Sequence, residues 1–170
     1  MKNVRGGVLG HVILWCERFC RKQKEIYYRT QYQGQGFICG DTVLQNPENI
    51  NIGKGSFINS GYVLASPNAK ITIGNHCMIS QNVHMRTEYH IHDRVDIPIY
   101  NQGQAEKDIV IGDDVWIGFG AQVMSGIKIG NGVIIGAGAI VTHDCEPYCI
   151  YAGVPAIKIK ERNKSTVGSE

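Results

Sequence analysis

The sequence lacks a strong charge of either sign. Its 170 residues carry a formal net charge of only +2, from 17 Lys and Arg against 15 Asp and Glu. So small a charge gives no global argument for binding to nucleic acid, where contacts between basic side chains and phosphates dominate the affinity. The charge is nevertheless uneven, because residues 1–33 and 156–170 are basic and residues 34–155 are acidic.

A long apolar run is also missing. The apolar stretch near residues 8–20 is interrupted by His11, Glu17 and Arg18, and it is shorter than the roughly 20 apolar residues that span a bilayer. It also lacks the cleavage-site pattern of a signal peptide. We therefore expect neither a membrane span nor a secretory leader, and we predict a cytoplasmic protein.

Two familiar patterns of metal or small-molecule binding are absent, and so is the glycine pattern of collagen. The six Cys contain no CxxC pair, so we interpret them as small buried thiols in a reducing compartment rather than as metal ligands. The stretches Gly118-Phe119-Gly120 and Gly136-Ala137-Gly138 lack the third glycine of a dinucleotide-binding fingerprint. The 21 glycines also lack the every-third spacing of collagen.

A six-residue period is present instead. It occupies the stretch "IVIGDDVWIGFGAQVMSGIKIGNGVIIGAGAIVT" (residues 109–142), where an aliphatic residue recurs at every sixth position: Ile111, Ile117, Val123, Ile129, Ile135 and Val141. The same period places Ile52, Ile58 and Leu64 in one register, and Ile73, Ile79 and Met85 in another. Such a repeat is typical of a hexapeptide parallel β-helix, in which three short strands close one coil and each strand points an aliphatic side chain inward.

Two further positions of the repeat fit this architecture. Gly-Asx pairs such as Gly74-Asn75, Gly112-Asp113 and Gly130-Asn131 suit turns, because these residues tolerate a positive φ. The residue four after each aliphatic is mostly small or β-branched, as a narrow interior requires. Tyr62, four after Ile58, is an exception.

The pattern divides the chain into three parts. Residues 1–33 form an N-terminal helical segment, residues 34–155 the hexapeptide-repeat domain, and residues 156–170 a basic C-terminal tail. Within the first part, residues 7–29 predict an amphipathic helix with an apolar stripe at Val8, Val12, Trp15 and Phe19. That helix either packs on the body of the protein or contacts an anionic membrane surface through its Lys and Arg residues. A break in the period, at about residues 86–108, predicts a projecting loop.

The motifs "DDVWIG", "GAGAIVT" and "AGVPA" occur in this order within residues 113–156. With the repeat around them, residues 50–162 resemble the hexapeptide-repeat acyltransferases. They are most similar to the sugar O-acetyltransferases of the galactoside and maltose type and of the capsule or exopolysaccharide type. The resemblance implies an all-β, left-handed parallel β-helix and a homotrimer with active sites between subunits. It also implies acetyl transfer from acetyl-CoA with neither a metal nor a covalent nucleophile.

The projecting loop carries the residues to which the resemblance assigns the chemistry. Attack of a hydroxyl on a thioester needs a base, and His is suited to that role near neutral pH. In similar proteins the catalytic His lies eleven residues after the aliphatic of the preceding hexapeptide, which from Ile79 gives His90. Ile91 follows it where Pro or Asp is usual, so His92 remains an alternative, with His84 a weaker one. The carboxylates that could orient the base are Glu88, Asp93 and Asp96.

The resemblance also suggests which residues bind the two substrates. By match to the family, the backbones at Phe119 and Ala137 line the pantetheine arm, although a residue smaller than Phe119 is usual there. Thr142 and His143 match positions near the CoA nucleotide. Lys160 matches a basic position in the tail, where Lys158 and Arg162 add further positive charge. Asn59 matches an Asn that bonds the sugar acceptor. A solvated tail and a structural turn Asn are the plainer interpretations of Lys160 and Asn59.

The predicted function is therefore acetyl-CoA-dependent O-acetylation of a sugar hydroxyl in capsule or exopolysaccharide biosynthesis, either in the open cytoplasm or beside the inner face of the membrane. One alternative is the same fold acting on an amino-sugar nitrogen, serine or an antibiotic. A second is a β-helix protein that is not an acyltransferase, either a zinc hydratase or a structural protein. A hydratase needs three converging His ligands, whereas His84, His90 and His92 crowd around one loop.

Overall fold

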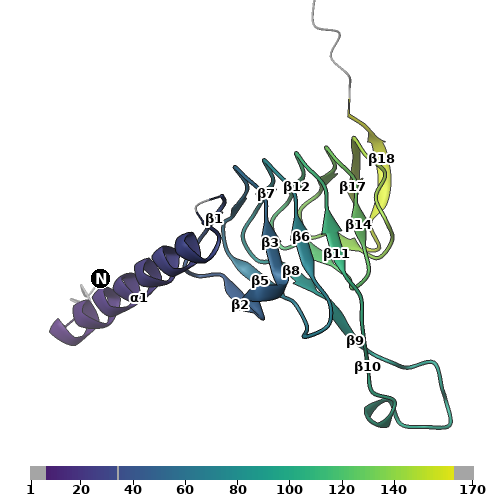
Figure 1. The fold of residues 1–170 in the computed structure, drawn as a ribbon, viewed down its shortest axis with the longest axis horizontal. Coiled ribbons are helices and arrows are strands. Elements are labelled where there is room, and N and C mark those ends of the chain that lie inside the picture. The colour runs from purple at the N-terminus through teal and green to yellow at the C-terminus, as the bar shows by residue number, and fades with distance from the viewer. Residues whose placement is uncertain (1–6, 34, 163–170) are drawn as a thin grey trace, which may run out of the picture.

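The structure, a computed structural model, describes residues 7–33 and 35–162. One helix, α1 (Val8–Gln31), precedes a parallel β-helix of stacked coils, and a long hairpin projects from the side of the stack (Figure 1). Short strands from successive coils pair in parallel to build three sheets, called here faces A, B and C. This architecture confirms the β-helix predicted from the six-residue period.

The three faces consist of the following strands. Face A contains β1 (Phe37–Ile38), β4 (Phe57–Ile58), β7 (Met78–Ile79), β12 (Trp116–Ile117), β15 (Ile134–Ile135), β17 (Cys149–Ala152) and β18 (Ile157–Glu161). Face B contains β2 (Val43–Gln45), β5 (Gly61–Leu64), β8 (Val83–Arg86), β13 (Gln122–Val123) and β16 (Ile140–Val141). Face C contains β3 (Ile50–Ile52), β6 (Ile71–Ile73), β11 (Ile109–Ile111) and β14 (Lys128–Ile129). Two 3-10 turns, Pro47–Asn49 and Ile99–Asn101, lie between strands.

The core consists of three columns of aliphatic side chains, one behind each face. On face A, for example, Ile58 pairs with Ile79, Ile79 with Ile117, and Ile117 with Ile135, and all four are buried. Each coil therefore rests on the aliphatic residue of the coil below it, and stability depends mainly on contacts between neighbouring coils.

One register prediction is wrong. Val63, not Leu64, pairs with Met85 in the inward column of face B. The coil between Ile58 and Val63 is one residue short, so Gly61 rather than Tyr62 occupies the inner position beside Val83. A Cβ on Gly61 would lie 2.3 Å from the carbonyl oxygen of Val83, so only glycine fits. Tyr62 consequently points outward, which explains the exception in the repeat.

The Gly-Asx pairs have a different role from the one predicted. Neither Gly112 nor Asp113 has a positive φ. A Cβ on Gly112 would instead lie 2.2 Å from Oδ1 of Asn131 in the next coil, so this glycine allows close stacking. The Asx side chains bind between coils, because the N–H of Asn75 donates to Oδ1 of Asp113 at 2.7 Å and the N–H of Asp113 to Oδ1 of Asn131 at 2.9 Å.

The helix α1 covers the first coil, and a further strand extends the last one. At the N-terminal end the last turns of α1 close the first coil: Tyr28 is buried and its hydroxyl donates to the carbonyl of Thr42 at 3.2 Å. At the C-terminal end β18 pairs antiparallel with β17 and continues face A. The predicted tail thus begins with a strand, and its residues 163–170 lie outside the described part of the chain.

The projecting loop is a hairpin built on β9 (Glu88–His90) and β10 (Gln104–Glu106), which pair antiparallel. Its two ends meet at the body, where the N–H of Lys107 donates to the carbonyl of Thr87 at 2.9 Å. The hairpin extends well beyond the stack of coils (Figure 1). The period therefore breaks where predicted, and the inserted residues leave the coil above and below undisturbed.

Candidate active site

The hairpin presents both predicted histidines to solvent. His90 ends β9 opposite Gln104 of β10, and His92 follows two residues later; both are exposed. Nδ1 of His92 lies 2.9 Å from the carbonyl oxygen of His90. Because a carbonyl only accepts, this contact fixes the proton of His92 on Nδ1 and leaves Nε2 as an acceptor when the ring is neutral. The ring of His90 has no such hydrogen bond to another described residue.

Two of the three candidate orienting carboxylates are already engaged by arginines. Glu88 forms an ion pair with Arg86, and Asp96 forms a two-pronged pair with Arg94. The hydrogen bond from Arg94 holds the pKa of the Asp96 carboxyl below its usual range. Asp93 has no hydrogen bond or ion pair to another described residue, so within one chain it is the carboxylate left free to orient a base.

A hollow of about 340 Å³ lies at the base of the hairpin, against the outer side of face B. Arg86, Tyr89 and Lys107 line it together with His84, and the ammonium of Lys107 lies 5.7 Å from the centre of the Tyr89 ring. Burial lowers the pKa of His84, and the nearby Arg86 adds to that effect. Sequence reasoning missed Arg86 and Lys107. Their position just before and just after the inserted hairpin was the signal that could have found them.

The residues predicted to bind the acyl donor arm and the sugar share one edge of the β-helix. This AB edge is where the chain turns from face A to face B. Asn59, Phe119 and Ala137 all lie on it, since each follows a strand of face A. The N–H groups of Phe119 and Ala137 donate to no other backbone carbonyl in the described residues. The side chain of Phe119 is 55% exposed. Free backbone donors on an open surface are what an amide-containing arm requires.

The other predicted cofactor residues lie elsewhere. Thr142 and His143 follow β16, on the edge where the chain turns from face B to face C, and Oγ1 of Thr142 lies 2.9 Å from Nδ1 of His143. The hairpin with His90 leaves the body from this same BC edge. Lys160 lies in β18 opposite Ile150, at the C-terminal end of face A.

The neighbours of Lys160 in the basic tail are held by the protein itself. Lys158 pairs with Glu146 at 2.8 Å, and Arg162 binds the Asp114 carboxylate at 2.9 Å and the Gly132 carbonyl at 2.7 Å. Lys160 forms no ion pair with a described residue. Of the three basic residues, Lys160 is thus the one available to a phosphate within this part of the chain.

One chain therefore does not bring the predicted site together. The hairpin and Thr142 lie on the BC edge, whereas Phe119, Ala137 and Asn59 lie on the AB edge, with face B between them. An active site that uses both sets needs two copies of the chain.

A surface suited to such an association lies on the outer side of face A. The residue directly before each inward aliphatic of this face is apolar, and these residues stand in register along the stack: Phe37, Phe57, Met78, Trp116, Ile134 and Ile150. The corresponding positions of face C are mostly polar: Asn51, Thr72, Val110 and Lys128. This row was not predicted from the sequence, although the pairs "FI", "FI", "MI", "WI" and "II" indicate it.

Among residues 7–33 and 35–162, no group of three His, Cys, Asp or Glu side chains is arranged to hold a metal ion. The cysteines are only partly as predicted. Cys77, Cys145 and Cys149 are buried, but Cys16 and Cys20 are exposed on α1. Burial, with a contribution from Asp144, raises the pKa of the Cys145 thiol to about 12, so this sulfur stays protonated and unreactive.

Comparison with known proteins identifies the repeat. Residues 108–143 match the family model described as bacterial transferase hexapeptide (six repeats). The polysialic acid O-acetyltransferase of Escherichia coli O1:K1 is 42% identical over 126 residues, which are 74% of this chain and 40% of that protein. A chloramphenicol acetyltransferase of Klebsiella aerogenes is 58% identical over 59 residues, which are 35% of this chain and 28% of that protein. The chain thus spans less than half the length of these curated relatives.

Solved structures show the same fold. A hexapeptide-repeat-containing acetyltransferase from Vibrio cholerae superposes with a TM-score of 0.67 at 27% identity, covering 85% of this chain and 82% of that chain. The same protein in complex with acetyl coenzyme A gives a TM-score of 0.66 at 24% identity, covering 94% of this chain and 92% of that chain. The repeat and the stacked coils are therefore those of left-handed β-helix proteins.

Proposed function

We propose that this chain is an acetyl-CoA-dependent O-acetyltransferase, because residues 108–143 match the bacterial transferase hexapeptide model and the fold is that of left-handed β-helix proteins. The acceptor is a sugar hydroxyl, and the reaction belongs to capsule or exopolysaccharide biosynthesis. The similarity to a polysialic acid O-acetyltransferase supports this acceptor class. The acetyl-CoA complex of the Vibrio cholerae protein supports the donor.

The observation that carries the proposal is the exposed histidine pair on the hairpin, His90 and His92. His90 accepts the proton of the acceptor hydroxyl while the hydroxyl oxygen attacks the carbonyl carbon of the thioester. A C–O bond forms, the C–S bond breaks, and the proton passes from His90 to the sulfur that leaves. The reaction needs no covalent nucleophile and no metal, and a base of this kind contributes on the order of 10²–10⁴ to the rate.

His92 is the alternative base. Its hydrogen bond to the carbonyl of His90 already gives it the tautomer that a base requires. If His90 is the base, the carboxylate that orients its ring comes from Asp93 or from a neighbouring copy.

We propose a homotrimer with active sites between subunits. The hairpin of one copy meets the AB edge of the next, which brings His90 to the donor arm at Phe119 and Ala137 and to the sugar at Asn59. Thr142, His143 and Lys160 then bind the nucleotide end of CoA. The outer apolar row of face A supports the association, because large exposed apolar surfaces are typical of subunit interfaces.

Free-thiol release from acetyl-CoA, followed against a panel of sugars, glycans and amines, tests the function. We expect His90→Ala to lose roughly 10²–10⁴ of the rate while the melting temperature stays unchanged. Val95→Ala, at a fully exposed hairpin position, is the matched control and should retain full activity. If His92→Ala rather than His90→Ala lost this activity, His92 would be the general base. No turnover with any acceptor, together with no CoA binding by calorimetry, would contradict the proposal.

A second acceptor class has specific support. The match to a chloramphenicol acetyltransferase reaches 58% identity within the aligned 59 residues. An antibiotic acceptor predicts thiol release with chloramphenicol in the same assay and none with sugars. The hollow at the base of the hairpin would then have to accommodate an aromatic drug beside Tyr89 and Met124.

We place the reaction in the cytoplasm, where acetyl-CoA is made and where free thiols persist. All six cysteines are unpaired. α1, the one helix longer than a single turn among the described residues, is not apolar enough to cross a membrane.

A further inference from the structure

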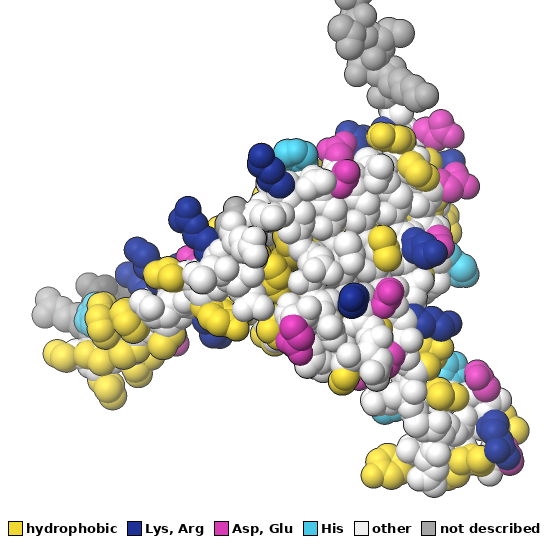
Figure 2. Space-filling view, in the orientation of Figure 1, with side chains coloured by type: hydrophobic (Ala, Val, Ile, Leu, Met, Phe, Trp, Pro, Cys, Tyr) yellow, Lys and Arg dark blue, Asp and Glu magenta, His cyan; other side chains and the backbone are white. Residues whose placement is uncertain are grey.

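Helix α1 carries a stripe of exposed apolar residues at coiled-coil spacing. Val8, Val12, Trp15, Phe19 and Ile26 are separated by four, three, four and seven residues, which is the a/d pattern of a heptad repeat. Each of these side chains is about half exposed or more. The rings of Trp15 and Phe19 stack 5.5 Å apart along the stripe. The space-filling view shows apolar side chains over the first turns of the helix (Figure 2).

The helix does not use this stripe to dock on its own body. Its contacts with the first coil come from the other side: Arg21 pairs with Asp41, Oε1 of Glu25 accepts from the N–H of Gly40 at 3.2 Å, and Tyr28 is buried. At 3.6 residues per turn, these side chains lie more than a quarter-turn away from the stripe. Of the two alternatives for this helix, packing on the body applies to its C-terminal half, where the side that carries Arg21, Glu25 and Tyr28 faces the first coil. The apolar stripe is left open.

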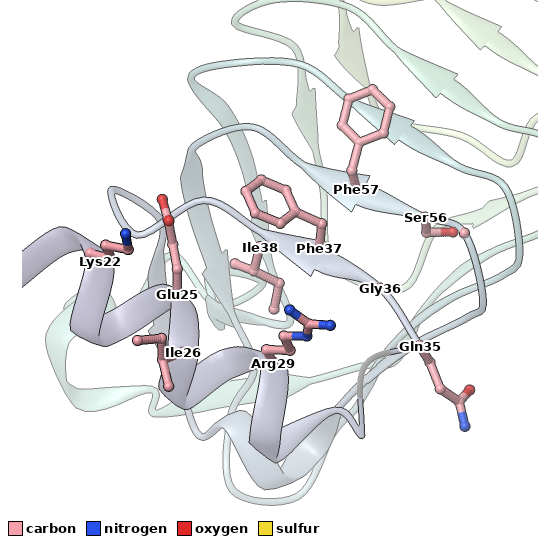
Figure 3. A pocket seen from close by; sticks show the side chains of 11 residues that line it. Lys22, Glu25, Ile26, Arg29, Gln35, Gly36, Phe37, Ile38, Ser56 and Phe57 are labelled. Carbon is pink, nitrogen blue, oxygen red and sulfur yellow. The ribbon is translucent and has the colours of Figure 1, made fainter.

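The stripe meets the apolar row of face A at a shared hollow. Ile26, at the C-terminal end of the stripe, lines a hollow of about 580 Å³ together with Phe37 and Phe57, the first two residues of that row. Figure 3 shows Ile26 and Arg29 on the helix across the hollow from Phe37. The apolar stripe of α1 and the apolar row of face A therefore border the same hollow, which Lys22, Glu25 and Arg29 also line.

We propose that the stripe of α1 packs against the same stripe of neighbouring copies, so that the subunits are joined at their N-terminal end by a parallel helix bundle. This inference rests on the proposed homotrimer. Figure 1 shows α1 extending beyond the first coil, roughly in line with the stack. Copies that associate with their stacks parallel thus carry their helices side by side, with the stripes on the same side as the face A rows.

The charges on the helix limit the bundle to its first three turns. Lys22 and Arg29 occupy the next d positions of the heptad, and both line the hollow beside Phe37. Three copies of each would repel in a closely packed core, so we place the close contact between Val8 and Phe19. A stripe of this length is too short to form a stable bundle alone. Association of the β-helix bodies supplies the effective concentration that the helices need.

An anionic lipid surface is the competing occupant, because the polar side of α1 is basic. The geometry favours a second copy for three reasons. The apolar stripe follows the seven-residue repeat of helix pairing, and it borders the same hollow as the apolar row of face A. A helix that lies in a membrane interface must instead lie flat on it, whereas α1 points along the stack (Figure 1).

Disulfide cross-linking tests the bundle. In a background with Cys16, Cys20 and Cys39 replaced by Ser, we expect Val12→Cys to form covalent dimers on mild oxidation, because equivalent a positions of a parallel bundle lie within disulfide range. Glu17→Cys, on the opposite side of the helix, is the matched control and should stay monomeric on a non-reducing gel. The double variant Trp15→Glu/Phe19→Glu should weaken subunit association by at least about tenfold.

The outcomes separate this inference from the proposed function. Thiol release from acetyl-CoA is measured on each variant: cross-linking without turnover would support the bundle and contradict the enzyme. If light scattering showed a trimer but the Val12→Cys variant did not cross-link, the helix bundle would be excluded. Flotation of the wild-type chain with vesicles containing phosphatidylglycerol, lost in the double variant and accompanied by no cross-linking, would assign the stripe to the membrane instead.

Discussion

The β-helix body and the β9–β10 hairpin differ in where their side chains point. In the body, each strand places an aliphatic residue in the interior, and Ile117 is fully buried. In the hairpin, Ile99 is 55% exposed and Tyr100 92% exposed. The hairpin is instead held by local polar contacts, since Nε2 of Gln102 donates to the carbonyls of Arg94 and Ile97 at 2.7 and 2.8 Å. The body carries the stability, whereas the hairpin is free to carry groups that must meet a substrate.

Removing the hairpin should have the largest effect. Because the N–H of Lys107 already donates to the carbonyl of Thr87, residues 88–105 can be replaced by Asn-Gly, a pair suited to a tight turn. Glu106 is kept, since its carboxylate accepts from the N–H of Asn68 at 2.8 Å. We expect thiol release from acetyl-CoA to fall by at least about 10², with a melting curve close to that of the wild type by circular dichroism. Turnover equal to wild type would move the chemistry out of the hairpin.

The converse variant keeps the hairpin and shortens a core side chain in one coil of the body. Ile117→Ala removes a side chain packed between Ile79 and Ile135, and such truncations cost roughly 2–5 kcal/mol. Ile99→Ala removes the same atoms from the hairpin, where exposure keeps the cost within about 0.5 kcal/mol. Urea unfolding at fixed protein concentration measures both. Equal losses in the two variants would mean that the hairpin packs against something in solution, such as another copy.

The same contrast explains which parts of the structure could be predicted from the sequence. The inward aliphatics such as Ile117 and Ile135 repeat because every coil repeats one geometry, so a period alone locates them. Val63 breaks the period by one residue, because Gly61 permits a closer approach between coils. The sequence contained that glycine but not the distance that makes it necessary.

The candidate site was less predictable for a physical reason. His90 and His92 are candidates because the loop interrupts the repeat and because the family resemblance places a catalytic His in it. The arginine partners of Glu88 and Asp96, in contrast, depend on side-chain geometry. The separation of Phe119 from the hairpin depends on which edge each turn occupies. The outer apolar row of face A could in principle be predicted, because each of its residues directly precedes an inward one. The six-residue period, however, identifies only the inward residues.

The ladder between coils offers a smaller test of the same contrast. Asp113→Ala removes Oδ1, which accepts from the N–H of Asn75 at 2.7 Å and from Nδ2 of Asn75 at 3.2 Å. Water reaches this exposed edge, so we expect a loss of only about 1 kcal/mol in the free energy of unfolding. Asp93→Ala in the hairpin removes a carboxylate without such contacts and should leave stability unchanged. If Asp93→Ala alone lowered the free energy of unfolding, the hairpin rather than the body would be the stabilising part.

Alkaline unfolding should produce the smallest and most local effect. Burial raises the pKa of Tyr32 to about 12, with contributions from Tyr28, Tyr27 and Glu48. An unfolded Tyr titrates near pH ~10, and the raised value favours the neutral phenol in the folded protein. The stability that Tyr32 contributes is therefore complete below pH ~10 and is lost as the pH rises through about 12.

A pair of Tyr→Phe variants isolates this contribution. Tyr32→Phe loses the hydrogen bond to the carbonyl of Pro47, so at pH ~8 it should be less stable than the wild type by roughly 1 kcal/mol. That difference should shrink or reverse by pH ~12, because Tyr32 ionises more readily in the unfolded wild type than in the folded protein, which lowers the stability of the wild type alone. Tyr100→Phe in the hairpin should match the wild type throughout, since exposure leaves its hydration nearly the same in the folded and unfolded chains. If the Tyr32→Phe difference did not vary with pH, α1 would have to detach from the first coil before Tyr32 ionises, and the cap would then be weaker than the coils it covers.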